Sequence, residues 1–274
     1  MDRGRCGMRI QIAKSTPLAW APDAVCKAIN RWTDHYAFLS NDPDDQADVI
    51  HFNNTFWKTD TPAVIQYHSE PTWKGLMLDC PYKKLVNAQY HMLLPEYADC
   101  DPVRQVINFC DPEWDMLDVP EPRIGYSPTS RVKVGQWHDK GYEATVAAIK
   151  ASGLAYDIIE GVSPEECIER KRHCSIIIDE CVTGSYHRSG LEGLALGKRT
   201  IGCISGTLQA WATHKFGSMI PICQPITGIK NAIGIVLYLS GKPGFSNRLW
   251  MLKHWHPADV VQEYVRAYEE VLAI

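Results

Sequence analysis

The sequence predicts an α/β protein made of two Rossmann-like domains that face a cleft. Short apolar runs alternate with segments of helical periodicity, as in parallel sheets that helices cover on both faces. The alternation breaks once, at the proline-rich, acidic stretch 111–122, and then restarts. The 274 residues are enough for two domains that each bury a core of their own.

One helix and six strands are predicted in the N-terminal half. The helix spans 21–32, where Pro22 is acceptable in the first turn. Ligands of parallel sheets bind at the carboxyl ends of the strands, so residues that directly follow a strand are the first candidates for a site. The strands are expected at 8–13, 36–40, 47–54, 62–68, 84–90 and 103–109.

Beyond the linker, strands and helices alternate again. Ser163, Pro164 and Glu166 form a capping box with proline at the first helical position, which marks a helix start. The tail, at 245–255 and 257–273, is predicted to be helical and amphipathic. The strands are expected at 123–127, 155–161, 174–179, 199–204 and 219–223, and the helices at 141–152, 163–173, 189–197, 207–217 and 228–241.

Composition narrows the functional classes. The net charge of −4 gives no basic field over the whole molecule, so a nucleic-acid partner depends on local patches, for which 171–174 and 247–256 are the candidates. No apolar run reaches the roughly 18 residues that span a bilayer, and the N-terminus does not resemble a signal peptide, so a cytoplasmic location is expected. None of the ten cysteines forms a CxxC pair, which predicts reduced thiols rather than a zinc or redox site.

The stretch TGSYHRSGLEGLALGKRTIG, at 183–202, is the most informative part of the chain. It places glycines and hydroxyls ahead of a helix whose N–H groups can bind phosphate. Glu192, in the first turn, can accept two hydrogen bonds from a ribose diol, and Gly184 and Gly190 allow close approach of backbone to ligand. The alternative is a tightly packed helix in which Glu192 is only a favourable first-turn acid. The P-loop pattern and GxGxxG are absent.

The run from Arg123 to Gly202 resembles the nucleotide-sugar-binding half of retaining, family-4-like GT-B glycosyltransferases, a family that includes glycogen synthase-like and sucrose synthase-like enzymes. Three pieces match in order: RIGYSPTSR with KGYEATVAAIK, then DIIEGVSPEECIERKRHCSIIIDE, then GSYHRSGLEGLALGKRTIG. ADVIHFNN and PAVIQYHSEP resemble the first domain loosely. The resemblance implies an acceptor-side domain at 1–115, a donor-binding domain at 123–250 and a C-terminal helix at 251–274 that packs on the first domain.

The resemblance also implies residue roles. Glu192 matches the second glutamate of the family's paired-glutamate motif, which contacts the ribose hydroxyls. Gly184 stands where the first glutamate is expected, and this departure leaves the identity of the sugar open. Lys140 and Arg131 match basic residues that bind the diphosphate and stabilise the leaving group, and Lys133 is a rival for either role.

The remaining candidates lie after strands and in the glycine-rich loop. His68 follows the fourth strand, where the family has a histidine near the donor sugar; equally, it is a strand-end histidine satisfied by a neighbouring carbonyl. On the acceptor side are Thr16, Trp20, which could stack on a sugar or a base, and Glu70, which could partner His68. The other donor-side candidates are Ser127, Ser185, Tyr186, His187, Ser189, Gly190 and Leu191.

The predicted function is transfer of a hexose or pentose from a nucleoside-diphosphate sugar to an acceptor hydroxyl, with retained configuration. No cofactor and no metal are expected, because fixed cations and helix dipoles can do the work of Mg²⁺; Asp42-Pro43-Asp44 has the DxD spacing, but it sits in an acidic surface loop. The acceptor is a glycan, a small molecule or, in a phage-type alternative, a hydroxymethylated base of DNA. Two further alternatives are a nucleotide-sugar epimerase or hydrolase, and a non-catalytic nucleotide-sugar-binding protein, for which Gly184 is the best argument.

Overall fold

The computed structural model describes residues 7–13, 20–44, 46–69, 71, 76–108, 117, 119–128, 140–225, 228–240 and 247–273, with backbone alone at 20 and 237–240. The chain divides into two compact units. Unit 1 consists of Met1–Asn108 with Trp255–Ile274, and unit 2 of Phe109–His254. Within the described ranges, no helix is long and apolar enough to cross a bilayer.

Unit 1 is built on a parallel sheet of six strands in the order β2-β1-β3-β4-β5-β6. From β1 the chain moves to β2 on one side and then to β3 on the other, so the topological switch point lies between β1 and β3. The strands are β1 (Arg9–Ile12), β2 (Tyr36–Leu39), β3 (Val49–Asn53), β4 (Ala63–Tyr67), β5 (Lys83–Asn87) and β6 (Asp101–Val103). The helices are α1 (Trp20–Trp32), α2 (Ala88–Leu93), the 3-10 turn η1 (Pro95–Tyr97) and α9 (Pro257–Leu272).

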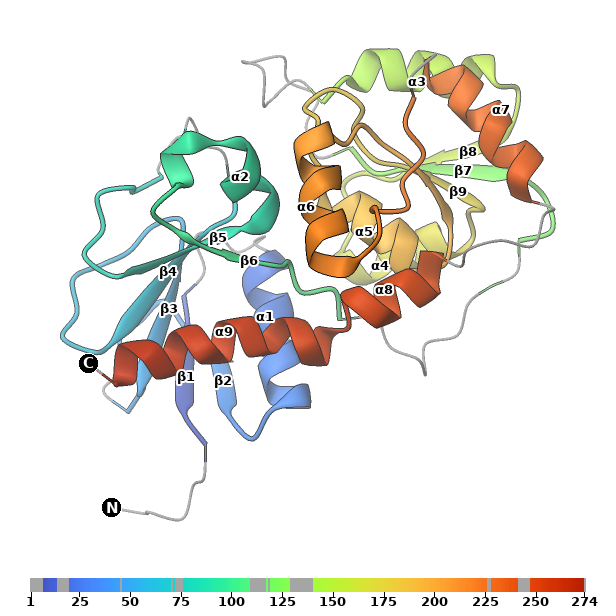
Figure 1. The fold of residues 1–274 in the computed structure, drawn as a ribbon. Coiled ribbons are helices and arrows are strands. Elements are labelled where there is room, and N and C mark those ends of the chain that lie inside the picture. The colour runs from blue at the N-terminus through green and yellow to red at the C-terminus, as the bar shows by residue number, and fades with distance from the viewer. Residues whose placement is uncertain are drawn as a thin grey trace. The chain divides into compact units, whose positions relative to one another are not determined.

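Helix α9 returns from the end of the chain to complete unit 1, where it packs against α1, β4 and β6 (Figure 1). It begins at Pro257, after His256, whose side chain caps the helix by accepting from the Ala258 N–H at 3.2 Å. Glu263 accepts from the backbone N–H and the Nε of Arg104 at 2.7 and 2.9 Å. These contacts tie residues far apart in the chain into one core.

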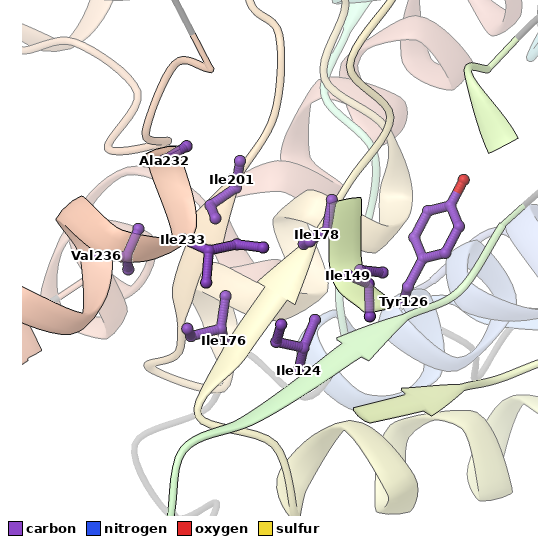
Figure 2. Close-up of a cluster of buried hydrophobic side chains, with 9 residues drawn as sticks. All are labelled: Ile124, Tyr126, Ile149, Ile176, Ile178, Ile201, Ala232, Ile233 and Val236. Carbon is purple, nitrogen blue, oxygen red and sulfur yellow. The ribbon is translucent and has the colours of Figure 1, made fainter. Parts of the chain in front are cut away.

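Unit 2 is built on a second parallel sheet, in the order β10-β9-β7-β8, and its switch point lies between β7 and β9. Figure 2 shows isoleucines of its strands packed against Ala232, Ile233 and Val236. The strands are β7 (Arg123–Tyr126), β8 (Ala155–Ile158), β9 (Ile176–Ile178) and β10 (Arg199–Ile201). The helices are α3 (Tyr142–Ala151), α4 (Pro164–Arg172), α5 (Arg188–Ala195), α6 (Gly206–Phe216), α7 (Ile229–Ser240) and α8 (Asn247–His254).

Three predicted strands differ from the structure. The run 84–90 splits into β5 and the start of α2. The predicted strand 103–109 is wrong beyond Val103: Glu263 takes the N–H of Arg104, and the Trp255 indole donates to the carbonyl of Gln105 at 2.8 Å. Segment 219–223 forms only a bridge between Ile201 and Cys223, because the side-chain amide of Gln209 hydrogen-bonds both backbone groups of Ile220. At Arg104, Gln105 and Ile220, side chains therefore take the backbone hydrogen bonds that a strand ladder would use.

Helix α5 lies unusually close to its sheet because glycines face β9 and β10. A Cβ built at Gly193 would lie 2.7 Å from Thr200 Oγ1 and 2.9 Å from Ile177 Cβ. A Cβ at Gly190 would lie 2.5 Å from Asp179 Oδ2. These glycines thus permit helix–sheet contact, which brings the first turn of α5 against the end of β9.

Substitution of Gly193 by Ala should destabilise the protein by about 1–3 kcal/mol, because the added methyl overpacks the α5–sheet contact. Urea unfolding measures the change in unfolding free energy. The matched control is Gly234→Ala in α7, where a Cβ meets nothing within 4 Å and the same change should be neutral or stabilising by about 0.5–1 kcal/mol. Equal effects at the two positions would contradict the packing argument.

Candidate functional site

The candidate site of unit 2 lies at the carboxyl edge of its sheet, at the switch point between β7 and β9. Lys140 lies two residues before α3, next to its N-cap Gly141, and His187 immediately precedes α5. The Lys140 Nζ lies 2.9 Å from His187 Nε2, and both residues are buried, each with 9% of its surface exposed. The fold therefore joins two predicted site residues that are 47 positions apart.

The protonation state of His187 follows from this contact. A lysine ammonium can only donate, so His187 Nε2 accepts and the proton of the neutral ring resides on Nδ1. Burial, followed by the nearby charge of Lys140, holds the pKa of His187 well below its usual value. His187 Nδ1 lies 3.6 Å from Glu180 Oε1 and 3.9 Å from Asp179 Oδ2. A neutral histidine thus stands between a cation and two acids.

Asp179 and Glu180, the two acids that directly follow β9, shape the next loop. Asp179 Oδ2 accepts the backbone N–H of His187 at 2.8 Å. Burial, with a further contribution from the charge of Glu180, raises the pKa of Asp179 to about 7. Glu180 accepts from the backbone N–H groups of Val182 and Thr183, at 3.0 and 2.9 Å, and from the Thr183 hydroxyl. The carboxylates therefore act here as acceptors that hold the loop and the first turn of α5.

Gly184 occupies a backbone conformation that a glutamate would adopt only with strain. Its φ is +76°, in the left-handed region, and its carbonyl accepts from the Ser205 N–H at 2.7 Å. This conformation explains in physical terms why glycine suits the position where the related motif has its first glutamate.

Glu192 is buried between two cations. Its Oε2 lies 2.5 Å from Lys171 Nζ, which also donates to Ser189 Oγ at 3.1 Å, and its Oε1 lies 2.9 Å from Arg188 Nε. Burial by itself opposes the charge on Lys171, but the adjacent Glu192 carboxylate outweighs it, and the pKa of Lys171 is raised. Arg188 covers Glu192 from the more open side, with 24% of its side chain exposed.

Some of the remaining donor-side candidates make polar side-chain contacts, and others are buried in the core. Ser127 Oγ lies 3.5 Å from Cys167 Sγ, and the Ser185 hydroxyl donates to the carbonyl of Tyr186 at 3.1 Å. Tyr186 and Leu191 are fully buried. Gly190 approaches Asp179, so in this structure the close approach at this glycine is to a side chain.

In unit 1, the carboxyl edge holds His68. Its Nε2 lies 2.6 Å from Asn53 Oδ1, and its backbone N–H donates to Asn54 Oδ1 at 2.9 Å. The predicted neighbouring carbonyl is thus the side-chain carbonyl of Asn53, the last residue of β3. Arg131, Lys133, Thr16 and Glu70 lie outside the described residues, as does the side chain of Trp20, the first residue of α1.

Several cations of the stretches predicted as nucleic-acid patches are paired or buried, although Lys253 in the second stretch is exposed. Lys171 is buried against Glu192, while Arg172 and His173 contact Glu169. In the second stretch, Arg248 is buried and donates to the carbonyl of Ala195 at 2.6 Å. The sequence pattern could not reveal this, because it counts cations without their partners.

Several residues of these networks were not predicted as site residues: Asn53, Lys171, Asp179, Glu180 and Arg188. Asp179 and Glu180 could have been found, because they directly follow the apolar strand SIII. Asp44, of the predicted DxD triplet, is ion-paired with Arg9 at 2.8 Å. In the part of the chain that the structure describes, no group of three or more histidine, cysteine or acidic side chains could hold a metal ion.

Comparison with solved structures shows which folds this chain is similar to. The structure matches AviGT4, a glycosyltransferase involved in avilamycin A biosynthesis, with 11% identity, coverage of 97% of this chain and 98% of the other, and a TM-score of 0.62. A glycosyltransferase from Rickettsia africae is 13% identical, with coverage of 97% of this chain and 99% of the other and a TM-score of 0.60. A Thermobaculum terrenum O-GlcNAc transferase mutant is 12% identical, with coverage of 98% of this chain and 69% of the other and a TM-score of 0.51.

No protein-family profile matches the sequence, and no curated protein matches it significantly. The structural likeness shows the fold: an α/β chain with two Rossmann-like units, as in GT-B glycosyltransferases. This confirms the predicted fold class, and the GT-B part of the predicted resemblance. The retaining, family-4-like character stays a prediction.

Substitution of Glu192 by Ala should cost about 3–5 kcal/mol of unfolding free energy, because it leaves Lys171 as an uncompensated buried charge. The paired change Lys171→Met with Glu192→Leu removes both charges and should recover most of the loss. Denaturant titrations of the two variants and the wild type measure the difference. A single variant as stable as the wild type would show that the pair does not hold the fold.

Asp179 should give unit 2 a pH dependence opposite to that of an ordinary acid. Its folded pKa of about 7 exceeds its usual 3.8, so the folded protein binds the extra proton, and this contribution to stability is lost as the pH rises from about 4 to 7. The D179N variant lacks this loss, so its stability relative to the wild type should increase over that window. Thermal unfolding at several pH values measures the stability difference between D179N and the wild type. A difference that does not change with pH would contradict the raised pKa of Asp179.

Proposed function

We propose that the protein transfers a sugar from a nucleoside-diphosphate sugar to an acceptor hydroxyl. The observation that carries this proposal is the Lys140–His187 pair, which holds a buried ammonium beside the first turn of α5 at the switch point of a sheet with the GT-B fold. Ligands of such sheets bind there. An ammonium and a helix N-terminus together attract a diphosphate.

In this proposal the diphosphate binds between Lys140 and the start of α5. The side chain of His187 does not cap that helix, and the N–H groups of a first turn have no partner within the helix. Arg131 and Lys133 are the other proposed diphosphate ligands. As the bond from the sugar to the diphosphate breaks, negative charge grows on the leaving oxygen, and the fixed cation stabilises it.

Glu192 is proposed to bind the ribose diol through its Oε1 edge. Lys171 orients the carboxylate from the buried side, and a carboxylate can accept further hydrogen bonds beyond those from Lys171 and Arg188. Binding of the diol displaces Arg188, whose guanidinium stands over this edge. Retention of configuration and independence from metals are part of the proposal and rest on the family resemblance.

A specific observation favours one alternative, a protein that binds the nucleotide-sugar without turnover. Gly184, whose backbone is left-handed, replaces the glutamate that the related motif uses near the sugar. The residues proposed to bind the diphosphate and the ribose, Lys140 and Glu192, are retained. The modified-DNA acceptor gains no support, because Lys171, Arg172 and Arg248 of the basic stretches are paired or buried.

One assay separates these functions. The full chain is incubated with UDP-, GDP- and ADP-sugars, with and without glycan and small-molecule acceptors, and nucleotide release and product mass are measured. Acceptor-dependent release supports transfer. Binding without release supports the non-catalytic alternative, and an isomerised sugar supports the epimerase. If none of the three nucleotides binds, the proposal is wrong.

The Lys140→Met variant should bind UDP, GDP or ADP about 10- to 100-fold more weakly than the wild type, because it loses a charge-assisted hydrogen bond to the diphosphate. Calorimetric titration measures the dissociation constant. Lys150→Met, in the exposed last turn of α3, is the matched control and should bind like the wild type. Equal affinities in the two variants would remove Lys140 from the site.

A further inference from the structure

Positive charge is concentrated in one part of an otherwise acidic chain. No aspartate or glutamate occurs between Glu192 and Asp259, whereas the 66 residues between them contain seven lysines and arginines. The rest of the chain carries all 32 acids against 21 lysines and arginines. Nearly all of this acid-free segment belongs to unit 2. Such an asymmetry indicates that part of unit 2 meets an anionic partner.

The structure separates the cations of this segment that support the fold from those that face solvent. Lys198 and Arg248 are buried and donate to backbone carbonyls at 3.1 and 2.6 Å. Lys215, in the last turn of α6, and Lys253, in the last turn of α8, are exposed. These two lysines therefore carry the exposed lysine charge of the two helices.

Packed aromatic rings join the end of α6 to α8 (Figure 1). The Phe216 ring lies 5.6 Å from the ring of Trp250 and 5.2 Å from that of His254, measured between centroids. The Trp250 indole donates to Ser218 Oγ at 2.8 Å, and Trp250 is buried, with 1% of its surface exposed. The last turn of α6 and the helix α8 thus form one continuous piece of surface.

Two large apolar side chains are exposed on this piece of surface. Leu249 exposes 64% of its surface and Met219 exposes 59%, more than any other large apolar residue that the structure describes. Leu249 and Lys253 are four positions apart on α8 and so share one face of the helix. The α6–α8 surface is defined here as Lys215, Met219, Leu249 and Lys253.

The α6–α8 surface is separate from the candidate site of unit 2. Helix α6 begins at Gly206, after β10, and therefore starts near the carboxyl edge of the sheet. Its 11 residues place its last turn about 16 Å further on. Helix α8 contacts the end of α5, where Arg248 meets the carbonyl of Ala195. The surface thus lies toward the amino edge, whereas Lys140 and His187 lie at the carboxyl edge.

We propose that the α6–α8 surface binds an anionic lipid bilayer. In this proposal the two lysines contact lipid headgroups, while Met219 and Leu249 enter the boundary between headgroups and acyl chains. Lysines beside exposed aliphatic side chains supply the electrostatic and the apolar contribution that interfacial binding combines. The binding does not depend on the proposed glycosyl transfer.

The same chemistry disfavours two other occupants. A nucleic acid would use the lysines but leave Met219 and Leu249 in water, and the buried Trp250 ring is unable to stack on bases. A second copy of this surface would bring lysines of like charge together across a two-fold interface. A lipid surface uses both the charge and the apolar side chains.

Co-sedimentation of the full chain with lipid vesicles tests the proposal. One set of vesicles contains phosphatidylcholine alone, and the other contains phosphatidylcholine with an equal part of phosphatidylglycerol. The protein should sediment with the mixed vesicles, more weakly with phosphatidylcholine, and less with the mixed vesicles as salt is added, because salt screens the lysines. Failure to bind the mixed vesicles, or equal binding to both sets at every salt concentration, overturns the proposal.

Substitutions locate the binding on the surface. Lys215→Gln and Lys253→Gln should each weaken binding to the mixed vesicles about fivefold. Met219→Ser and Leu249→Ser should each weaken it about three- to tenfold, because less apolar area leaves water. The matched controls are Lys58→Gln and Leu272→Ser, at exposed positions of unit 1, which should bind like the wild type.

All six positions are exposed, so thermal unfolding should show every variant folded like the wild type. Surface variants that bind vesicles as well as the controls do would overturn the proposal. Duplex DNA that binds more tightly than the mixed vesicles, without any effect of Leu249→Ser, would assign the lysines to a nucleic acid instead. A dimer detected by light scattering and abolished by Leu249→Ser would assign the surface to a second copy. Absence of nucleotide binding or sugar transfer counts against the proposed function alone.

Discussion

The buried pair of Lys171 and Glu192 holds together the part of unit 2 on which its site depends. Burial makes an isolated charge expensive, so neither residue is tolerable at this depth without the other. The pair joins α4 to the first turn of α5, and Ser189 and Arg188 add one further hydrogen bond each to Lys171 and Glu192. Once that turn is placed, His187 lies over the acids that end β9, and Lys140 is held at the same edge.

The two histidines of interest have opposite tautomers, each for a reason that lies in its partner. His187 accepts at Nε2, because a lysine ammonium can only donate. His68 donates at Nε2, because the oxygen of Asn53 can only accept. One ring therefore accepts from a lysine ammonium, while the other donates to an amide oxygen.

Sequence identities of 11–13% to the similar glycosyltransferases show how weakly this fold constrains individual residues. The apolar pattern of the strands and the glycines that let α5 approach its sheet suffice to specify the architecture. Function depends on fewer positions. Gly184 is the clearest case, since its left-handed backbone suits glycine where the resemblance places a glutamate.

The sequence by itself determined the order and type of most elements, because apolar periodicity and capping residues such as Ser163 are local signals. It also located the edge of the sheet where Lys140 and His187 meet, since parallel strands present their carboxyl ends together. Local pattern failed at 103–109 and 219–223, where Glu263, Trp255 and Gln209 take the backbone hydrogen bonds. Only the tertiary structure decided that Lys171 meets Glu192 and that Asn53 orients His68, because such contacts depend on how helices and strands pack, and spacing along the chain does not record it.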